Sequence, residues 1–155
     1  MRIVIADHQD KVRYALRTLL RRQIGLDVVG EAITAGELLD QVSLHDPDLV
    51  VLHWRLCEEM ADLLTQVRQI CPGISVLVLS ARPEARCDAL AAGADAFACK
   101  MDSPKRLLAT LETLTNGRAR SSRPTVLLPA DANGDEGALN AAVACGGSER
   151  PPASP

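Results

Sequence analysis

Five short apolar runs, separated by segments with helical spacing, constrain the fold of this chain more than any other feature. The runs are rich in branched side chains and cover residues 3–6, 28–29, 49–52, 76–79 and 96–99. Continuous apolarity, in place of strict alternation, is typical of strands that are covered on both faces, as in a parallel sheet. Five such strands alternating with five helices predict an α/β fold, a three-layer α/β/α sandwich with right-handed crossovers.

The segments between the runs carry apolar residues at the spacing of one helix face. In the first segment Val12, Leu16 and Leu19 share one face. Arg13 and Arg17 fall on the opposite face, which we expect to be exposed to solvent. The other predicted helices cover about residues 38–42, 60–71, 83–92 and 104–117.

Residues with special backbone preferences mark the ends of the last two helices. We expect Gly93 to end the fourth helix, because glycine readily takes the left-handed conformation of a helix cap. Ser103 and Pro104 predict the start of the fifth helix, as an N-cap and a proline at the first helical position. Asn116 and Gly117 predict its end.

Beyond residue 117 the periodic pattern is lost, and the chain becomes rich in proline and glycine. We therefore expect one domain over residues 1–117 and a disordered tail over residues 118–155 that holds no output domain. The apolar stretch 125–128 is the exception within that tail, as a segment that could dock on the domain or on a partner, but we expect it to be unstructured too.

Length, charge and cysteine content exclude several classes of protein. A chain of 155 residues has room for one domain, and a net charge of −3 gives no basic surface for direct nucleic-acid binding. No apolar run approaches the ~18 residues that span a bilayer, and no secretory signal follows Arg2, so we expect a cytoplasmic protein without membrane contact. Five cysteines without a CxxC pair are expected to be reduced thiols.

Polar side chains follow four of the five predicted strands, at the point where each strand ends. Asp7 and His8 follow the first strand, and His53 ends the third. Ser80 ends the fourth strand, and Lys100 follows the fifth. Because active sites of parallel α/β sheets lie at the carboxyl ends of the strands, we expect these five side chains to line one pocket.

The amino-acid sequence of these segments resembles that of the receiver domain of bacterial two-component response regulators, over residues 2 to about 117. It is most similar to the receivers whose proteins usually carry a C-terminal helix-turn-helix. This resemblance implies a flavodoxin-like fold with a five-stranded parallel sheet in the order 2-1-3-4-5. The segments that carry it are IVIAD (3–7), VVGEA (28–32), PDLVVL (47–52), VLVLSA (76–81) and GADAFACK (93–100), followed by a Ser-Pro pair.

The resemblance also implies a phosphorylation pocket. In such receivers two acidic residues after the first strand hold magnesium, and an aspartate that ends the third strand is phosphorylated. A hydroxyl and a lysine at the ends of the fourth and fifth strands contact the phosphoryl group. Position by position, Asp7 matches the first acidic residue, Ser80 the hydroxyl and Lys100 the lysine. Phe97 matches the aromatic residue that changes rotamer on activation.

Three positions depart from this pattern. His8 replaces the second acidic residue, His53 replaces the phospho-accepting aspartate, and Cys57 replaces a proline. Three carboxylates and one lysine would leave two negative charges for a divalent ion, whereas Asp7 and Lys100 sum to zero when both imidazoles are neutral. We therefore expect a vestigial pocket, with weak or no magnesium binding and no acyl-phosphate.

These features predict a stand-alone, non-enzymatic receiver that binds a signalling partner, such as a histidine kinase or another regulator. Trp54, which follows the pocket, and Phe97 are the candidate switch or interaction residues. The expected contact surface lies on the fourth and fifth helices, with its exposed cations Arg82, Arg86, Lys105 and Arg106. The oligomeric state and the identity of the partner stay open.

Two further functions remain alternatives. His53 is a substitute phosphate acceptor in the first, as a nitrogen nucleophile of a phosphorelay. In the second, the altered pocket senses a ligand or a transition metal, with Asp7, His8 and His53 as zinc or nickel donors and Cys57 within reach. Their spacing matches no recognised metal signature, so we expect no metal or other cofactor. No oxyanion hole or third orienting group accompanies Cys57 and His53, and Ser80 lacks a nucleophile elbow.

Overall fold

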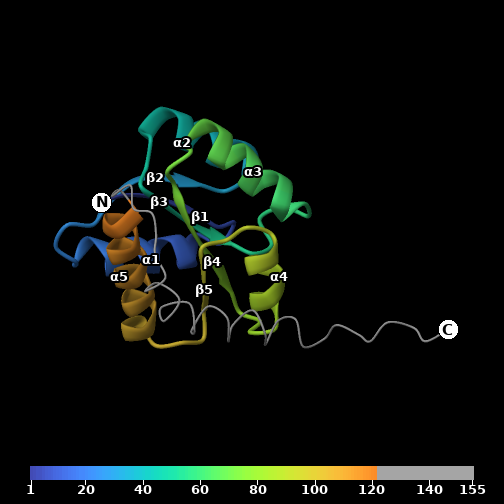
Figure 1. Ribbon diagram of the computed structural model, residues 1–155. Helices are drawn as coiled ribbons and strands as arrows, with labels where there is room; N and C mark the ends of the chain where they lie inside the picture. The colour runs from blue at the N-terminus through green and yellow to red at the C-terminus, as the bar shows by residue number, and fades with distance from the viewer. Residues whose placement is uncertain (122–155) are drawn as a thin grey trace, which may run out of the picture. The chain divides into compact units, whose positions relative to one another are not determined.

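The structure, a computed structural model, describes residues 1–121, with side chains for residues 1–117. The described residues form five strands and five helices in alternation (Figure 1). The strands are β1 (Arg2–Ala6), β2 (Asp27–Ala32), β3 (Leu49–His53), β4 (Ser75–Ser80) and β5 (Ala96–Cys99). The helices are α1 (Asp10–Arg21), α2 (Ala35–His45), α3 (Met60–Ile70), α4 (Ala85–Ala91) and α5 (Pro104–Ser121).

The strands form one parallel sheet in the order β2-β1-β3-β4-β5, which confirms the predicted flavodoxin-like topology. β1 lies at the centre of the pairing between β2 and β3, and its Ile3 aligns with Leu49 of β3. At the other end of β3, His53 aligns with Leu79 of β4. Since every pairing is parallel, all carboxyl ends lie at one edge of the sheet.

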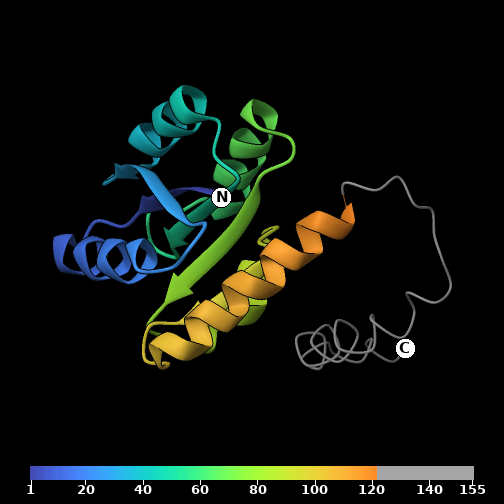
Figure 2. The ribbon, with the colours of Figure 1, turned by 90° about the vertical axis from the view of Figure 1, so that its left-hand side faces the viewer.

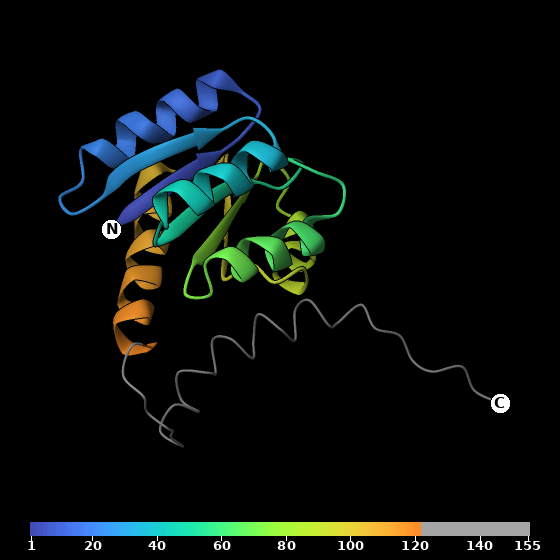
Figure 3. The same ribbon diagram turned by 90° about the horizontal axis from the view of Figure 1, so that it is seen from above.

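Each strand sends alternate side chains to opposite faces of the sheet, and both faces are covered by helices. On β1, Ile3 and Ile5 pack with buried leucines of α1 and α5, whereas Val4 and Ala6 pack with α2, α3 and α4. Figure 3 shows α1 and α2 on opposite sides of the sheet. Because both faces of the sheet are buried, the strands appear in the sequence as continuous apolar runs.

The predicted helix ends are confirmed at two places and wrong at one. Gly93 has a φ of +111° directly after α4, and the hydroxyl of Ser103 accepts a hydrogen bond from the amide of Arg106 at the start of α5. However, α5 does not end at Asn116 and Gly117 but continues to Ser121 (Figure 2). Glycine weakens a helix by about 1 kcal/mol relative to alanine, and it ends one only where it takes a cap conformation.

The tail predicted from residue 118 lies, beyond residue 121, outside the described residues, and so does the apolar stretch 125–128. Within the described part, no helix is both long and apolar enough to cross a bilayer. The thiols of Cys57 and Cys99 are free, and the thiol of Cys71 donates a hydrogen bond to Asp46. Cys87 is disulfide-bonded, which corrects the expectation of a reduced thiol there.

Candidate functional site

The carboxyl ends of β1, β3, β4 and β5 bring the predicted pocket residues to one edge of the sheet. Asp7 lies directly after β1 and is only 1% exposed. His53 and Ser80 are the buried last residues of β3 and β4. Lys100 follows β5, and its amide donates a hydrogen bond to the carbonyl of Ser80. The five predicted residues, His8 included, lie at the ends of four separate strands, and the parallel sheet places these strand ends side by side.

An ion pair between Asp7 and Lys100 lies at the centre of this pocket. The ammonium nitrogen of Lys100 lies 2.5 Å from Oδ2 of Asp7. The other carboxylate oxygen, Oδ1, accepts a hydrogen bond of 2.9 Å from the amide of Gln9. Both oxygens of the buried carboxylate therefore already have partners within the protein.

The imidazole of His53 faces the same carboxylate without a hydrogen bond to it. Its Nδ1 lies 3.9 Å from Oδ2 of Asp7, is buried, and has no hydrogen-bond partner among the described residues. Burial lowers the pKa of His53 below its usual value of 6.5, and the positive charge of Lys100 lowers it further, whereas Asp7 acts in the opposite direction. The imidazole is therefore neutral at pH 7.

His8 lies at the exposed rim of the pocket. Its Nδ1 is 3.7 Å from Oδ1 of Asp7, and half of its side chain is exposed. The rings of His8 and His53 are tilted by 52° with their centroids 5.0 Å apart. The structure thus brings together four of the five predicted pocket residues around a single carboxylate.

Ser80, the fifth residue, is buried at the end of β4. Its hydroxyl oxygen accepts a hydrogen bond of 3.0 Å from the amide of Arg82, which leaves the hydroxyl proton available as a donor. Among the described residues, the Ser80 side chain makes no hydrogen bond to Asp7 or His53, so it belongs to the wall of the pocket and not to its charged centre.

The pocket does not fit the magnesium ion that the resemblance implies. Magnesium takes oxygen ligands in octahedral geometry. Asp7 supplies the only carboxylate among the five residues, and Lys100 and Gln9 already engage its two oxygens. Nδ1 of His53, which faces this carboxylate and has no hydrogen-bond partner in the described part of the chain, is a nitrogen and not an oxygen. In the part of the chain that the structure describes, no three His, Cys, Asp or Glu side chains are grouped to hold a metal ion.

Trp54, Phe97 and Cys57, the other residues singled out in the sequence, are partly buried. Trp54 and Phe97 pack against the core on the side of α2, α3 and α4, and the amide of Trp54 donates a hydrogen bond to Leu79. Cys57 packs against the same core, and burial raises the pKa of its thiol, which disfavours the thiolate that a nucleophile needs. The cations predicted as contacts are exposed: Arg82, Arg86, Lys105 and Arg106.

Sequence reasoning missed Arg13, which it placed on the solvent face of the first helix. The guanidinium of Arg13 is buried, and its Nη1 donates a hydrogen bond of 2.6 Å to the carbonyl of Asp7. It also pairs with Asp10 and with Glu31, and Glu31 binds Arg17 as well. Arg13 therefore ties the segment that carries Asp7 to α1 and β2. The spacing of Arg13 in α1, opposite the apolar residues, predicts an exposed side chain. The long arginine side chain instead reaches the end of β1, and the spacing of residues does not reveal this.

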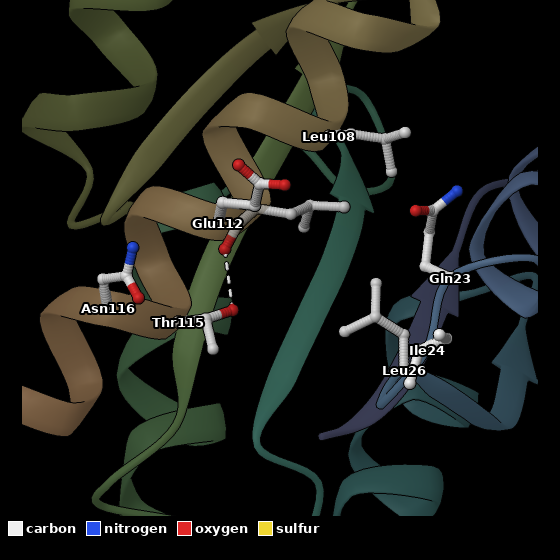
Figure 4. A pocket seen from close by; sticks show the side chains of 8 residues that line it. Gln23, Ile24, Leu26, Leu108, Glu112, Thr115 and Asn116 are labelled. Atoms are coloured by element: carbon white, nitrogen blue, oxygen red, sulfur yellow. Dashed lines mark hydrogen bonds between the residues drawn. The ribbon is translucent and has the colours of Figure 1, made fainter.

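A separate hollow of about 310 Å³ lies between the α1–β2 connection and α5 (Figure 4). Leucines, among them Leu26 and Leu108, line it together with the polar Gln23, Glu112 and Asn116. Leu26 directly precedes β2, so this hollow lies toward the amino ends of the strands. None of the five strand-end residues lines it.

Comparisons with known sequences relate the chain to response regulators. Residues 3–112 match the family model of the response regulator receiver domain. The chain is similar to the uncharacterized transcriptional regulatory protein YhcZ of Bacillus subtilis (strain 168), with 34% identity over 113 residues, 71% of this chain and 53% of that protein. It is also similar to the DNA-binding transcriptional activator DevR/DosR of Mycobacterium tuberculosis, with 31% identity over 126 residues, 77% of this chain and 56% of that protein.

The matched region thus spans little more than half the length of these relatives. Among solved structures, the chain is similar to a two-component response regulator of the LuxR family from Aurantimonas sp. SI85-9A1. That comparison has a TM-score of 0.67 and 27% identity, and it covers 76% of this chain and 86% of the other.

Proposed function

Because this chain belongs to the response regulator receiver domain family of two-component signalling, we propose that it signals through protein contacts, without phosphorylation of its strand-end pocket. The observation that carries the proposal is the imidazole of His53 at the end of β3, where the resemblance places the phospho-accepting carboxylate. An acyl-phosphate needs a carboxylate, so this position has no group on which one can form.

The charge of the pocket supports the same proposal. Phosphoryl transfer depends on positive charge, usually from a metal ion, that stabilises the transferring group. Here the carboxylate of Asp7 is neutralised by Lys100, and the two imidazoles are poor ligands for magnesium. The protein therefore acts as a binding module and not as an enzyme, and it needs no cofactor at this site.

His53 is a poor substitute acceptor for geometric reasons. It is 8% exposed, and its Nδ1 points toward the carboxylate of Asp7 at 3.9 Å. A phosphoryl group on this nitrogen would meet that negative charge in a buried space. Burial and like charge both disfavour the product, so the phosphorelay alternative receives no support from the geometry.

We propose a signalling protein as the partner, either a histidine kinase or another regulator. The surface offered is formed by α4 and α5, where Arg86, Lys105 and Arg106 are exposed. Phe97 and Trp54 are partly buried against the core, so each ring keeps some surface that a partner could contact.

Trp54 is the only tryptophan of the chain, and its position next to His53 makes it an internal reporter. The test adds a small phosphodonor and magnesium while tryptophan fluorescence is recorded. We expect no change for the natural chain and a saturable change for the double variant His8→Asp/His53→Asp, which restores both carboxylates. A saturable, magnesium-dependent response of the natural chain would contradict the proposal.

A further inference from the structure

The hollow between the α1–β2 connection and α5 has a fully exposed isoleucine at its edge (Figure 4). This residue, Ile24, has a relative exposure of 103%, the highest of the large apolar side chains in the described part of the chain. A single exposed apolar side chain is common on protein surfaces. Here, however, the hollow beside it is lined by Leu26 and by the buried Leu111, so an apolar protrusion and an apolar recess are neighbours.

A tight turn holds Ile24 in this position. The amide of Leu26 donates a hydrogen bond of 3.4 Å to the carbonyl of Gln23, and Gly25 between them has a φ of +86°, which favours glycine. The amino group of Met1 donates a further hydrogen bond of 2.6 Å to the carbonyl of Gly25. Because the backbone of the turn is held in place, Ile24 can be buried against a partner with little loss of conformational freedom.

The opposite wall of the hollow is one face of α5. Its lining residues follow helical spacing, at positions 108, 111, 112, 115 and 116. Leu108 and Leu111 form the apolar part of this wall, and Glu112, Thr115 and Asn116 form the polar part. The recess therefore suits an apolar side chain that is accompanied by a polar or charged neighbour.

Exposed charges of both signs flank the hollow. Arg22, at the end of α1, directly precedes the lining residue Gln23, and Glu112 lies on the α5 side. Neither forms an ion pair with another residue within 1–117. This face thus carries a protrusion and a recess, and a cation and an anion. Such a face can pair with an identical copy of itself, because every contact of a twofold dimer occurs twice.

We propose that two copies of the chain associate through this face about a twofold axis. Ile24 of each copy enters the hollow of the other, and Arg22 of each copy lies beside Glu112 of the other. The charges favour a second copy, since a uniformly acidic or basic partner would be repelled by one side of the hollow. None of the five strand-end residues lines the hollow, so the association does not depend on the proposed lack of phosphorylation.

The size of the face predicts a reversible dimer. Eight described residues line the hollow, whereas a stable interface uses about 20–30 residues on each side. Salt screens ion pairs between exposed side chains, but it does not weaken the burial of Ile24. We therefore expect association that rises with protein concentration and that decreases, without vanishing, at high salt.

The first test is sedimentation velocity of the full chain over a range of protein concentrations. Ile24→Ser should raise the dissociation constant of the dimer by about tenfold or more. Leu44→Ser is the matched control, because Leu44 is also an exposed apolar residue, at 72%, but lies on α2. A natural chain that stays monomeric overturns the proposal, whether the hollow takes another protein or another segment of the same chain. Equal effects of the two variants overturn it as well.

A charge exchange tests the twofold pairing. Arg22→Glu and Glu112→Arg should each weaken the dimer, because each places like charges against one another at both contacts. A mixture of the two variants should associate as the natural chain does, since both contacts then pair opposite charges. Both positions are exposed, and melting temperatures verify that each variant is folded. A mixture that associates no better than the separate variants overturns the proposal.

Discussion

The ammonium of Lys100 lies 2.5 Å from Oδ2 of Asp7, and the carboxylate of this pair is 1% exposed. The two residues are 93 positions apart in the sequence, and they meet because β1 and β5 end at the same edge of a parallel sheet. With imidazoles at positions 8 and 53, where the receiver pattern has two further acidic groups, Asp7 is the one carboxylate of the pocket and Lys100 balances its charge. We therefore expect this pocket to bind a divalent cation weakly.

Replacement of Lys100 should lower the free energy of unfolding more than replacement of Asp7. Lys100→Met strands a carboxylate that is almost fully buried, and loss of a buried partner costs about 3–5 kcal/mol. Asp7→Asn leaves an ammonium that reaches solvent, so its cost should be smaller. The double variant should cost less than the sum of the single variants.

Urea denaturation of the four proteins measures this cycle. Equal costs for the two single variants would contradict the predicted asymmetry, and strict additivity in the double variant would show that the two side chains do not stabilise each other.

The free energy of unfolding should fall as the solution is acidified below pH 6.5. The pKa of His53 is lowered in the folded protein, mainly by burial, so the unfolded chain binds the proton more readily. The contribution of the neutral imidazole is complete above 6.5 and is lost as the pH falls through the folded pKa. Denaturation curves at a series of pH values measure this slope.

His53→Gln should reduce the dependence of the free energy of unfolding on pH. His8→Gln is the control, because half of the His8 side chain is already exposed in the folded protein. A slope that survives in His53→Gln would assign the acid sensitivity to another group.

Magnesium should not stabilise the natural chain at concentrations that saturate a receiver with three pocket carboxylates. The pocket supplies one carboxylate, and both of its oxygens have partners. His8→Asp/His53→Asp adds two oxygen ligands and should show a concentration-dependent rise in melting temperature, as expected for a ligand that binds the folded state. Calcium and sodium chloride at matched ionic strength are the controls. A magnesium-specific rise in the natural chain would contradict this account of the pocket.

Arg13→Ala should destabilise the fold by about 2 kcal/mol, because hydrogen bonds to charged groups contribute roughly 1.5–3 kcal/mol each and this guanidinium is 9% exposed. Arg21→Ala, at an exposed position of the same helix, should change stability by no more than about 0.5 kcal/mol. Chemical denaturation compares the two. Equal effects would mean that the contact between Arg13 and the Asp7 carbonyl contributes nothing.

The sheet and its strand order were predictable because burial on both faces leaves a direct trace in the sequence. The runs 49–52 and 76–79 are continuous apolar segments, and the structure places them in the central strands β3 and β4. The edge strand β2 was predicted less completely. The prediction covered residues 28–29, whereas β2 extends from Asp27 to Ala32. Its Gly30 and Glu31 interrupt the apolar run, because an edge strand is only partly covered.

The candidate site was predictable in its members but not in its contacts. Strand ends alone brought Asp7, His53 and Lys100 together, since parallel strands share one carboxyl edge. Two features depend on side-chain directions that periodicity does not encode: Nδ1 of His53, which has no hydrogen-bond partner within residues 1–117, and the buried guanidinium of Arg13. The continuation of α5 past Gly117 was missed for a related reason, because a glycine ends a helix only in a cap conformation.

The central claim, that the pocket takes no phosphoryl group, is tested most directly by intact mass measurement after incubation with a small phosphodonor and magnesium. Peptide mapping then locates any adduct, and His8→Asp/His53→Asp is the matched positive variant. We expect the natural chain to keep its mass and the double variant to gain one phosphoryl group at position 53. A phosphoryl group on His53, or on any other residue of the natural pocket, would contradict the claim.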